Sequence, residues 1–167
     1  FENGGLQEGV DMAVNGGGQF DGDVTISGFT LTGSSYGVYI PTGLESGNTV
    51  SVSNCLIYAN SSAGIYGGGN LDGDIFIDDC IIAENGELLT GVHLVAVGGT
   101  VEITDSVIGA YWDATTSTAY AGNTGIILCC PYRATGFFRI LNHGAKFNHF
   151  ENFYICGIGA TNPSLTE

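Results

Sequence analysis

Apolar and polar residues alternate in four short segments of the chain that repeat one another. The first segment begins at Val24 and reads Val-Thr-Ile-Ser-Gly-Phe-Thr-Leu, and the others begin at residues 50, 75 and 101, so the period is 25 or 26 residues. In each segment the first and third positions are β-branched and apolar, and the residues between them are mostly polar. This period of two indicates a strand with one buried face, and a repeat of roughly 20 to 50 residues is typical of a solenoid.

The fifth position of each repeat predicts a tight corner. Glycine, asparagine and aspartate, which adopt a positive φ or bond their own backbone most readily, occupy it at Gly28, Asn54, Asp79 and Asp105. The alternation restarts after the corner with its phase shifted. The next position in each repeat is therefore expected to form an internal ladder of Phe29, Cys55, Cys80 and Ser106. The two cysteines are expected to pack there as reduced thiols, with a disulfide as the alternative.

A glycine followed by an apolar residue recurs between these segments and predicts a third strand in each unit. The glycines are Gly9, Gly37, Gly64, Gly91 and Gly125. Three short strands per turn and about five turns predict an all-β parallel β-helix, a single domain over residues 1–167. Regular turns are expected over 9–143, with a side loop at 109–124 and an aromatic cap or interface in the tail at 144–167.

The phrase shared by the four segments, [VI]-x-[VI]-x-[NDG]-[CFS]-x-[IL], resembles that of the right-handed parallel β-helix (pectate-lyase-like) superfamily. This is the fold of pectate lyases, polygalacturonases, phage tailspikes and many surface proteins. The resemblance covers residues 9–141 and implies a right-handed coil. It implies little about function, because the same fold supports enzymes, adhesins and inert rods.

The charge of the chain and the length of its apolar runs each exclude one class of partner. Seventeen acidic residues and three basic residues give a formal net charge of −14. Phosphate contacts need lysine and arginine, so we expect no nucleic-acid partner. No apolar run approaches the ~18 residues of a membrane span, so we expect no membrane insertion. An acidic surface is typical of an extracellular protein, and an extracellular or virion-surface location is expected.

Two Asp-Gly-Asp segments are candidates for binding a metal. They contain Asp21 and Asp23 in one turn and Asp72 and Asp74 two turns later. Stacked carboxylates could hold Ca²⁺, which prefers oxygen ligands. The same residues are also ordinary turn formers, and no other cofactor is expected.

Three aspartates near one corner are candidates for catalysis. Asp78, Asp79 and Asp105 fall on successive turns, where two carboxylates ~5 Å apart could serve as the nucleophile and acid of a glycoside hydrolase. The resemblance to polygalacturonases implies the same activity. A polysaccharide lyase would need basic residues that the first four turns lack. A corner role explains Asp79 and Asp105 equally well, because Gly28 and Asn54 fill the same position in other turns.

The side loop is a candidate binding site. It contains the single tryptophan of the chain, Trp112, together with Tyr111, Asp113 and Tyr120. Insertions in solenoids often form the binding face, and aromatic rings beside a carboxylate and hydroxyl groups suit a sugar or a protein partner. The alternative is that Tyr111 and Trp112 pack back against the rod.

A second candidate binding surface is an outward ladder of Tyr39, Tyr66 and His93, which occupy equivalent positions in successive turns. Such an aromatic stripe suits protein docking or sugar stacking.

The aromatic tail is expected to cover the end of the rod or to form an oligomer interface, because exposed strand edges invite association. The residues concerned are Phe147, Phe150, Phe153 and Tyr154. Trimeric fibres of this fold meet through such surfaces. We therefore expect self-association, with a trimer favoured, or contact with other structural proteins of an assembly.

Two functions follow from these expectations. The first is a non-catalytic structural module of a virion or cell-surface assembly, such as a fibre, decoration or adhesin segment. The alternative is a β-helix that binds or degrades carbohydrate. The geometry of the carboxylates separates the two, because an enzyme needs them to converge in an open groove.

Overall fold

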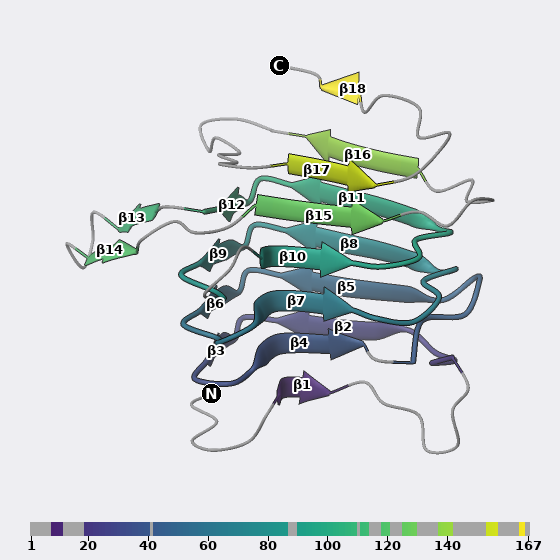
Figure 1. Cartoon of the computed structure of the whole chain (residues 1–167), viewed down its shortest axis with the longest axis horizontal. Coiled ribbons are helices and arrows are strands. Elements are labelled where there is room, and N and C mark those ends of the chain that lie inside the picture. Colours follow the sequence, from purple (N-terminus) through teal and green to yellow (C-terminus); the bar gives the residue numbers. More distant parts are fainter. Residues whose placement is uncertain are drawn as a thin grey trace.

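The structure, a computed structural model, is a parallel β-solenoid in which short strands stack coil upon coil (Figure 1). Among the residues that it describes there is no helix, which confirms the prediction of an all-β fold. The described residues are 8–11, 19–40, 42–86, 90–109, 111–113, 118–120, 125–129, 137–141, 153–156 and 164–165.

Three parallel sheets form the sides of the solenoid. The first sheet consists of β2 (Val24–Ser27), β5 (Thr49–Ser53), β8 (Asp74–Asp78), β11 (Thr100–Thr104), β16 (Phe137–Leu141) and β18 (Ser164–Leu165). The second sheet consists of β3 (Thr30–Thr32), β6 (Leu56–Tyr58), β9 (Ile81–Ala83) and β12 (Val107–Ile108). The third sheet consists of β1 (Glu8–Asp11), β4 (Tyr36–Ile40), β7 (Ala63–Gly67), β10 (Thr90–Leu94), β15 (Gly125–Cys129) and β17 (Phe153–Cys156).

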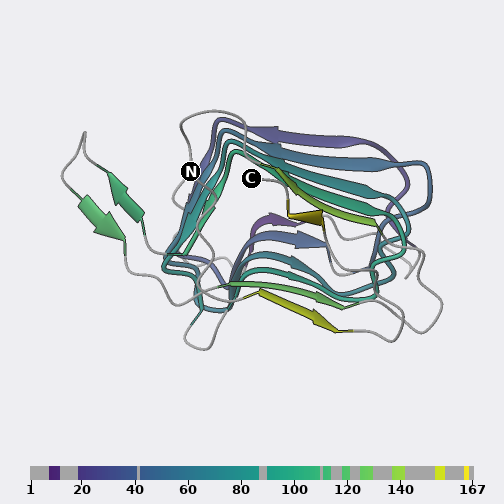
Figure 2. The same ribbon diagram turned by 90° about the horizontal axis from the view of Figure 1, so that it is seen from above.

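Each complete coil contributes one strand to every sheet. Three coils run from β2 to β4, from β5 to β7 and from β8 to β10, and a fourth runs from β11 through β12 to β15. A hairpin of β13 (Tyr111–Asp113) and β14 (Thr118–Tyr120) interrupts this fourth coil. The described residues thus show about three regular turns where about five were predicted. Seen from above, the coils run counterclockwise towards the viewer, which makes the solenoid right-handed (Figure 2).

The predicted corner ladder lies between the first and second sheets. Gly28, Asn54, Asp79 and Asp105 have φ values of 75°, 50°, 48° and 46°. This left-handed region is open to glycine and tolerated by asparagine and aspartate, because their short polar side chains bond locally. The corner amide of Asn54 donates to the carbonyl of Asp78 in the next coil at 3.0 Å, so the corners also join the coils.

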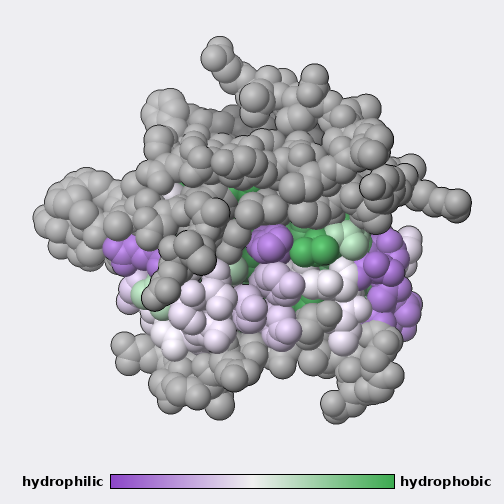
Figure 3. Space-filling model, in the orientation of Figure 1, coloured by the Kyte–Doolittle hydropathy of each residue, from purple (hydrophilic) through white to green (hydrophobic). Residues whose placement is uncertain are grey.

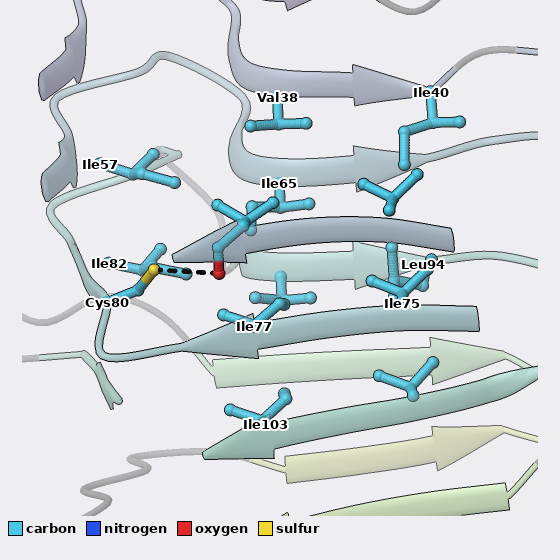
Figure 4. Packing of buried hydrophobic residues seen from close by; sticks show 14 of the residues in the cluster. Val38, Ile40, Ile57, Ile65, Ile75, Ile77, Cys80, Ile82, Leu94 and Ile103 are labelled. Carbon is cyan, nitrogen blue, oxygen red and sulfur yellow. Dashed lines mark hydrogen bonds between the residues drawn. The ribbon is translucent and has the colours of Figure 1, made fainter. Parts of the chain in front are cut away.

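The interior is a stack of aliphatic side chains, one layer per coil (Figure 4). The inward column of the second sheet is fully buried and consists of Leu31, Ile57, Ile82 and Ile108. A fourth short ladder, of Phe20, Leu44, Leu71 and Val97, closes the corner between the third and first sheets. Each fully buried aliphatic side chain contributes about 1.5–3 kcal/mol relative to exposure.

The thiols of Cys55 and Cys80 are buried in adjacent coils and no disulfide joins them, and their burial confirms that they pack inside the solenoid. Cys55 Sγ lies 3.1 Å from the carbonyl oxygen of Ser53, and Cys80 Sγ lies 3.2 Å from that of Asp78. The next rung is Ser106, whose Oγ accepts a 3.0 Å hydrogen bond from the Cys80 amide. The hydrogen bond with Cys55, together with burial, raises the pKa of the Cys80 thiol and keeps it protonated.

The prediction that Phe29 lies inside this ladder is wrong. Its side chain is 47% exposed, the largest exposure of a bulky apolar residue in the described part of the chain. Phe29 directly precedes β3, which is the terminal strand of the second sheet. The equivalent cysteines have small side chains whose sulfur atoms lie 3.1 and 3.2 Å from backbone carbonyl oxygens, a space that a phenyl ring cannot occupy.

A second buried ladder, of polar residues, crosses the corner between the second and third sheets. Asn60 and Asn85 are 1% and 0% exposed, and Asn60 Nδ2 donates to Asn85 Oδ1 at 2.9 Å. The amide groups also satisfy backbone carbonyls, because Asn60 Nδ2 donates to Leu31 O at 3.1 Å and Asn85 Nδ2 donates to Ile57 O at 2.8 Å. Ser34 is the first rung, and its amide donates to Asn60 Oδ1 at 3.2 Å.

Candidate functional site

Aromatic side chains form a strip on the outer face of the third sheet. Register places Tyr39 beside Tyr66, and Tyr66 beside His93, as the sequence predicts. The ring centroids of Tyr39 and Tyr66 are 5.8 Å apart, and those of Tyr66 and His93 are 5.3 Å apart with the rings nearly perpendicular. The edge-to-face contact between Tyr66 and His93 is a favourable arrangement of aromatic rings.

Tyr36 is a fourth member of the strip that the sequence analysis missed. Its ring stacks on Tyr39 with centroids 4.7 Å apart and an interplanar angle of 7°, and it lies 4.9 Å from Tyr66. The signal in the sequence is its place directly before Gly37, the glycine that opens the third strand of its coil. We call Tyr36, Tyr39, Tyr66 and His93 the aromatic strip.

Glycine makes room for the strip. A Cβ atom at Gly68 would lie 2.8 Å from Cε1 of Tyr66 and 3.1 Å from its hydroxyl oxygen. The ring of Tyr66 therefore lies over the backbone of the segment that follows β7. The packed rings are half-buried, and the burial of His93 lowers the pKa of its imidazole, which favours the neutral ring.

The strands that carry the aromatic strip contain no charged residue. Asp, Glu, Lys and Arg are absent from β4, β7, β10, β15 and β17, whereas the terminal strand β1 contains Glu8 and Asp11, and Asp11 is in register with Tyr39. Figure 3 faces this sheet, and the strongly hydrophilic colour of its described part lies mostly at the two sides. In a chain of net charge −14, this face is suited to contact with an uncharged ligand or protein surface.

The candidate catalytic aspartates lie at the corner between the first and second sheets. Asp79 and Asp105 both have the positive φ that the corner requires. Asp78 is exposed at the end of β8, and its Oδ1 accepts a short hydrogen bond from the hydroxyl of Thr104 in the next coil. Asp79 and Asp105 thus form the corners of their coils, and Asp78 links its coil to the next one.

The four candidate metal ligands are engaged with neighbouring coils. The carboxylates of Asp23 and Asp74 each accept a hydrogen bond of 2.8 Å from a backbone amide of the following coil, from Thr49 and Thr100 respectively. Within the described residues, no three His, Cys, Asp or Glu side chains gather as a metal site would require.

The other two members of this set bond to side-chain amides. Asp21 accepts from Asn48 at 3.1 Å, and Asp72 accepts from Gln19 at 2.9 Å. All four contacts join one coil to another, so they contribute to stacking.

The side loop contains the β13–β14 hairpin, which projects from the stack (Figures 1 and 2). Its two strands pair antiparallel, with Tyr111 opposite Tyr120, Trp112 opposite Ala119 and Asp113 opposite Thr118. The two described strands of this segment belong to none of the three sheets of the stack.

Half of the predicted tail interface lies in a strand. Phe153 and Tyr154 belong to β17, which pairs with β15 and continues the third sheet. Phe147 and Phe150 lie outside the described residues. Tyr154 falls in register with Ile127, which is beside His93, so β17 continues the column of the aromatic strip.

Comparison of the chain with protein families, with curated proteins and with solved structures finds no match. No helix in the described part of the chain is long and apolar enough to cross a membrane.

Proposed function

We propose that the chain is a non-catalytic structural module of a virion or cell-surface assembly, which works by self-association and contact with other structural proteins. The observation that carries this proposal is the use of the acidic residues. Asp79 and Asp105 form the corner, Asp78 bonds to Thr104, and the Asp-Gly-Asp carboxylates bond to neighbouring coils. An enzyme would need some of these groups directed at a substrate.

Asparagine at the two corner positions tests this function. Asp79→Asn and Asp105→Asn are each expected to change the free energy of unfolding by less than about 0.5 kcal/mol, because Asn54 already occupies the same corner. Thermal denaturation followed by circular dichroism measures the change.

An assay for cleavage of polysaccharides tests the absence of activity. When polygalacturonate or a soluble neutral glucan is incubated with the wild-type protein, we expect no more reducing ends to be released from the polysaccharide than with a heat-denatured sample. Release that falls in the asparagine variants would contradict the proposal.

Carbohydrate binding without cleavage is the second candidate, and the aromatic strip favours it. Every ring in the strip carries a polar atom, and the strands beneath it are uncharged. Amphipathic rings of this kind pair an apolar face with a hydrogen-bonding group, which suits a hydroxylated ligand. Binding of a neutral glucan that is lost in Tyr66→Ala and retained in Tyr58→Ala, a half-buried tyrosine of the second sheet, would support it.

A further inference from the structure

The outer face of the second sheet carries an aliphatic column. The sequence phrase shared by the four segments does not show it, because any residue is allowed at that position. Register aligns Thr30 with Leu56, Leu56 with Ile81, and Ile81 with Val107 along the axis of the rod. The neighbouring column, from Leu31 to Ile108, is fully buried, so Leu56, Ile81 and Val107 lie on the opposite, outer side, where they are half-buried. The exposed Phe29 lies directly before the first rung. We call Leu56, Ile81 and Val107 the outer stripe.

The stripe is uniformly aliphatic, whereas the corresponding outward column of the first sheet is mostly polar. In register, that column consists of Thr25, Ser51, Phe76 and Glu102. The outer stripe thus places three aliphatic residues from successive coils on the outer side of a parallel sheet. Apolar patches of this kind mark surfaces that contact another protein.

Electrostatics restricts which surfaces of two copies can meet. Each copy has a net charge of −14, so contact between acidic faces is repulsive. The strands of the second sheet contain no Asp, Glu, Lys or Arg. The insertion at 109–124 contains a single charged residue, Asp113. These two elements match in charge, and both are unusually neutral for this chain.

The hairpin is placed to reach another molecule. It begins just after β12, the terminal strand of the second sheet, and β13 and β14 pair with each other while the hairpin projects away from its own stack (Figures 1 and 2). It contains Tyr111, Trp112 and Tyr120, residue types that are enriched in the centres of protein interfaces.

The geometry points to an exchange of arms between copies of this chain, in which the β13–β14 hairpin of one copy docks on the outer stripe of another. The inference rests on the self-association in the proposed function and names its surface. Each copy offers one arm and one stripe, so the contact closes either reciprocally in a pair or around a ring of copies. The trimer expected from the sequence is a ring of this kind.

The single tryptophan reports the docking directly, because Trp112 lies in the hairpin. We expect the emission of the full chain to shift to shorter wavelength as the protein concentration rises, in step with the increase in mass measured by light scattering. Ile81→Glu places a charge in the centre of the stripe and is expected to abolish both changes. Ser51→Glu, the same charge at a half-buried outward position of the first sheet, is the matched control and should behave as wild type.

A mixture of two variants identifies the arm and the stripe as partners. Trp112→Ser impairs the arm and Ile81→Glu impairs the stripe, so each variant alone should remain monomeric. When the two variants are mixed, the Ile81→Glu chain supplies an intact hairpin and the Trp112→Ser chain supplies an intact outer stripe. We therefore expect complexes that contain both variants. As a control, circular dichroism must show that each variant is folded and unfolds at the same temperature as the wild-type protein.

The outcomes separate this inference from the proposed function. Assembly that persists in Ile81→Glu, or that leaves the tryptophan emission unchanged, overturns the arm exchange and leaves a self-associating module. A wild-type chain that stays monomeric at every concentration overturns both.

Discussion

Replacing Asn85 with leucine is expected to lower the free energy of unfolding by about 4 kcal/mol, because the buried asparagine ladder loses one of its two amide side chains. Asn85 Nδ2 donates to Ile57 O, and its Oδ1 accepts from both the side chain and the backbone amide of Asn60. Leucine has a similar volume but makes none of these bonds. The carbonyl of Ile57 and the amide of Asn60 would be left buried without these partners, at a cost of about 1–3 kcal/mol for each unsatisfied group.

Urea denaturation of wild type and variant measures this loss. Asn70→Leu is the matched control, because Asn70 is exposed at a corner, and it is expected to change stability by less than about 0.5 kcal/mol. Equal losses in the two variants would show that the ladder contributes no more than a surface asparagine.

Replacing Gly69 with alanine is expected to destabilise the fold by about 3 kcal/mol through overpacking at the corner between the third and first sheets. An added Cβ would lie 2.4 Å from the backbone nitrogen of Gly43 and 2.4 Å from the carbonyl carbon of Thr42. Both contacts are with backbone atoms of the preceding coil. No side chain can rotate away, so the two coils must separate.

Gly33→Ala is the control for this variant. Gly33 has a φ of 77° and no atom within 4 Å of an added Cβ, and Ala59 occupies the equivalent corner of the next coil with a φ of 52°. We expect Gly33→Ala to cost less than about 1 kcal/mol in thermal denaturation. A loss of stability in Gly69→Ala no larger than that in Gly33→Ala would show that the close approach of the two backbones at Gly69 costs nothing and would contradict the expected overpacking.

The sequence predicted the coils well because their constraint is local. Alternation of period two defines which face of each strand is buried, and a corner with positive φ admits few residue types, so Asn54, Asp79 and Asp105 could be identified from their spacing. The register of 25 or 26 residues then aligned Tyr39, Tyr66 and His93, since side chains at equivalent positions of neighbouring coils must stack.

Features that depend on contacts between coils were missed. Asn60 and Asn85 each lie three residues beyond the end of their repeat, where a polar residue reads as an ordinary turn, and only the stacked coils show that their amides meet. The prediction for Phe29 failed because the repeat treats its position as equivalent to those of Cys55 and Cys80, whose small thiols lie within 3.2 Å of backbone carbonyl oxygens. The close approach of Gly69 to Gly43 is likewise a property of two coils.

The sequence could predict where the side chains of the candidate site lie better than it could predict what they bind. The outward positions of a sheet are free of packing constraints, so the fold does not determine whether Tyr66 or Ile81 meets a sugar, a second copy or solvent. The corner carboxylates show the reverse case, because the positive φ of Asp79 and Asp105 explains why the coil places aspartate there without reference to any ligand.

The mass of the chain in solution tests the central claim most directly. Light scattering over a range of concentrations is expected to give a multiple of the 17.3 kDa chain mass, with three copies favoured, and addition of a chelator is expected to leave that mass unchanged. A mass of one chain at every concentration would contradict the account of a self-associating structural module.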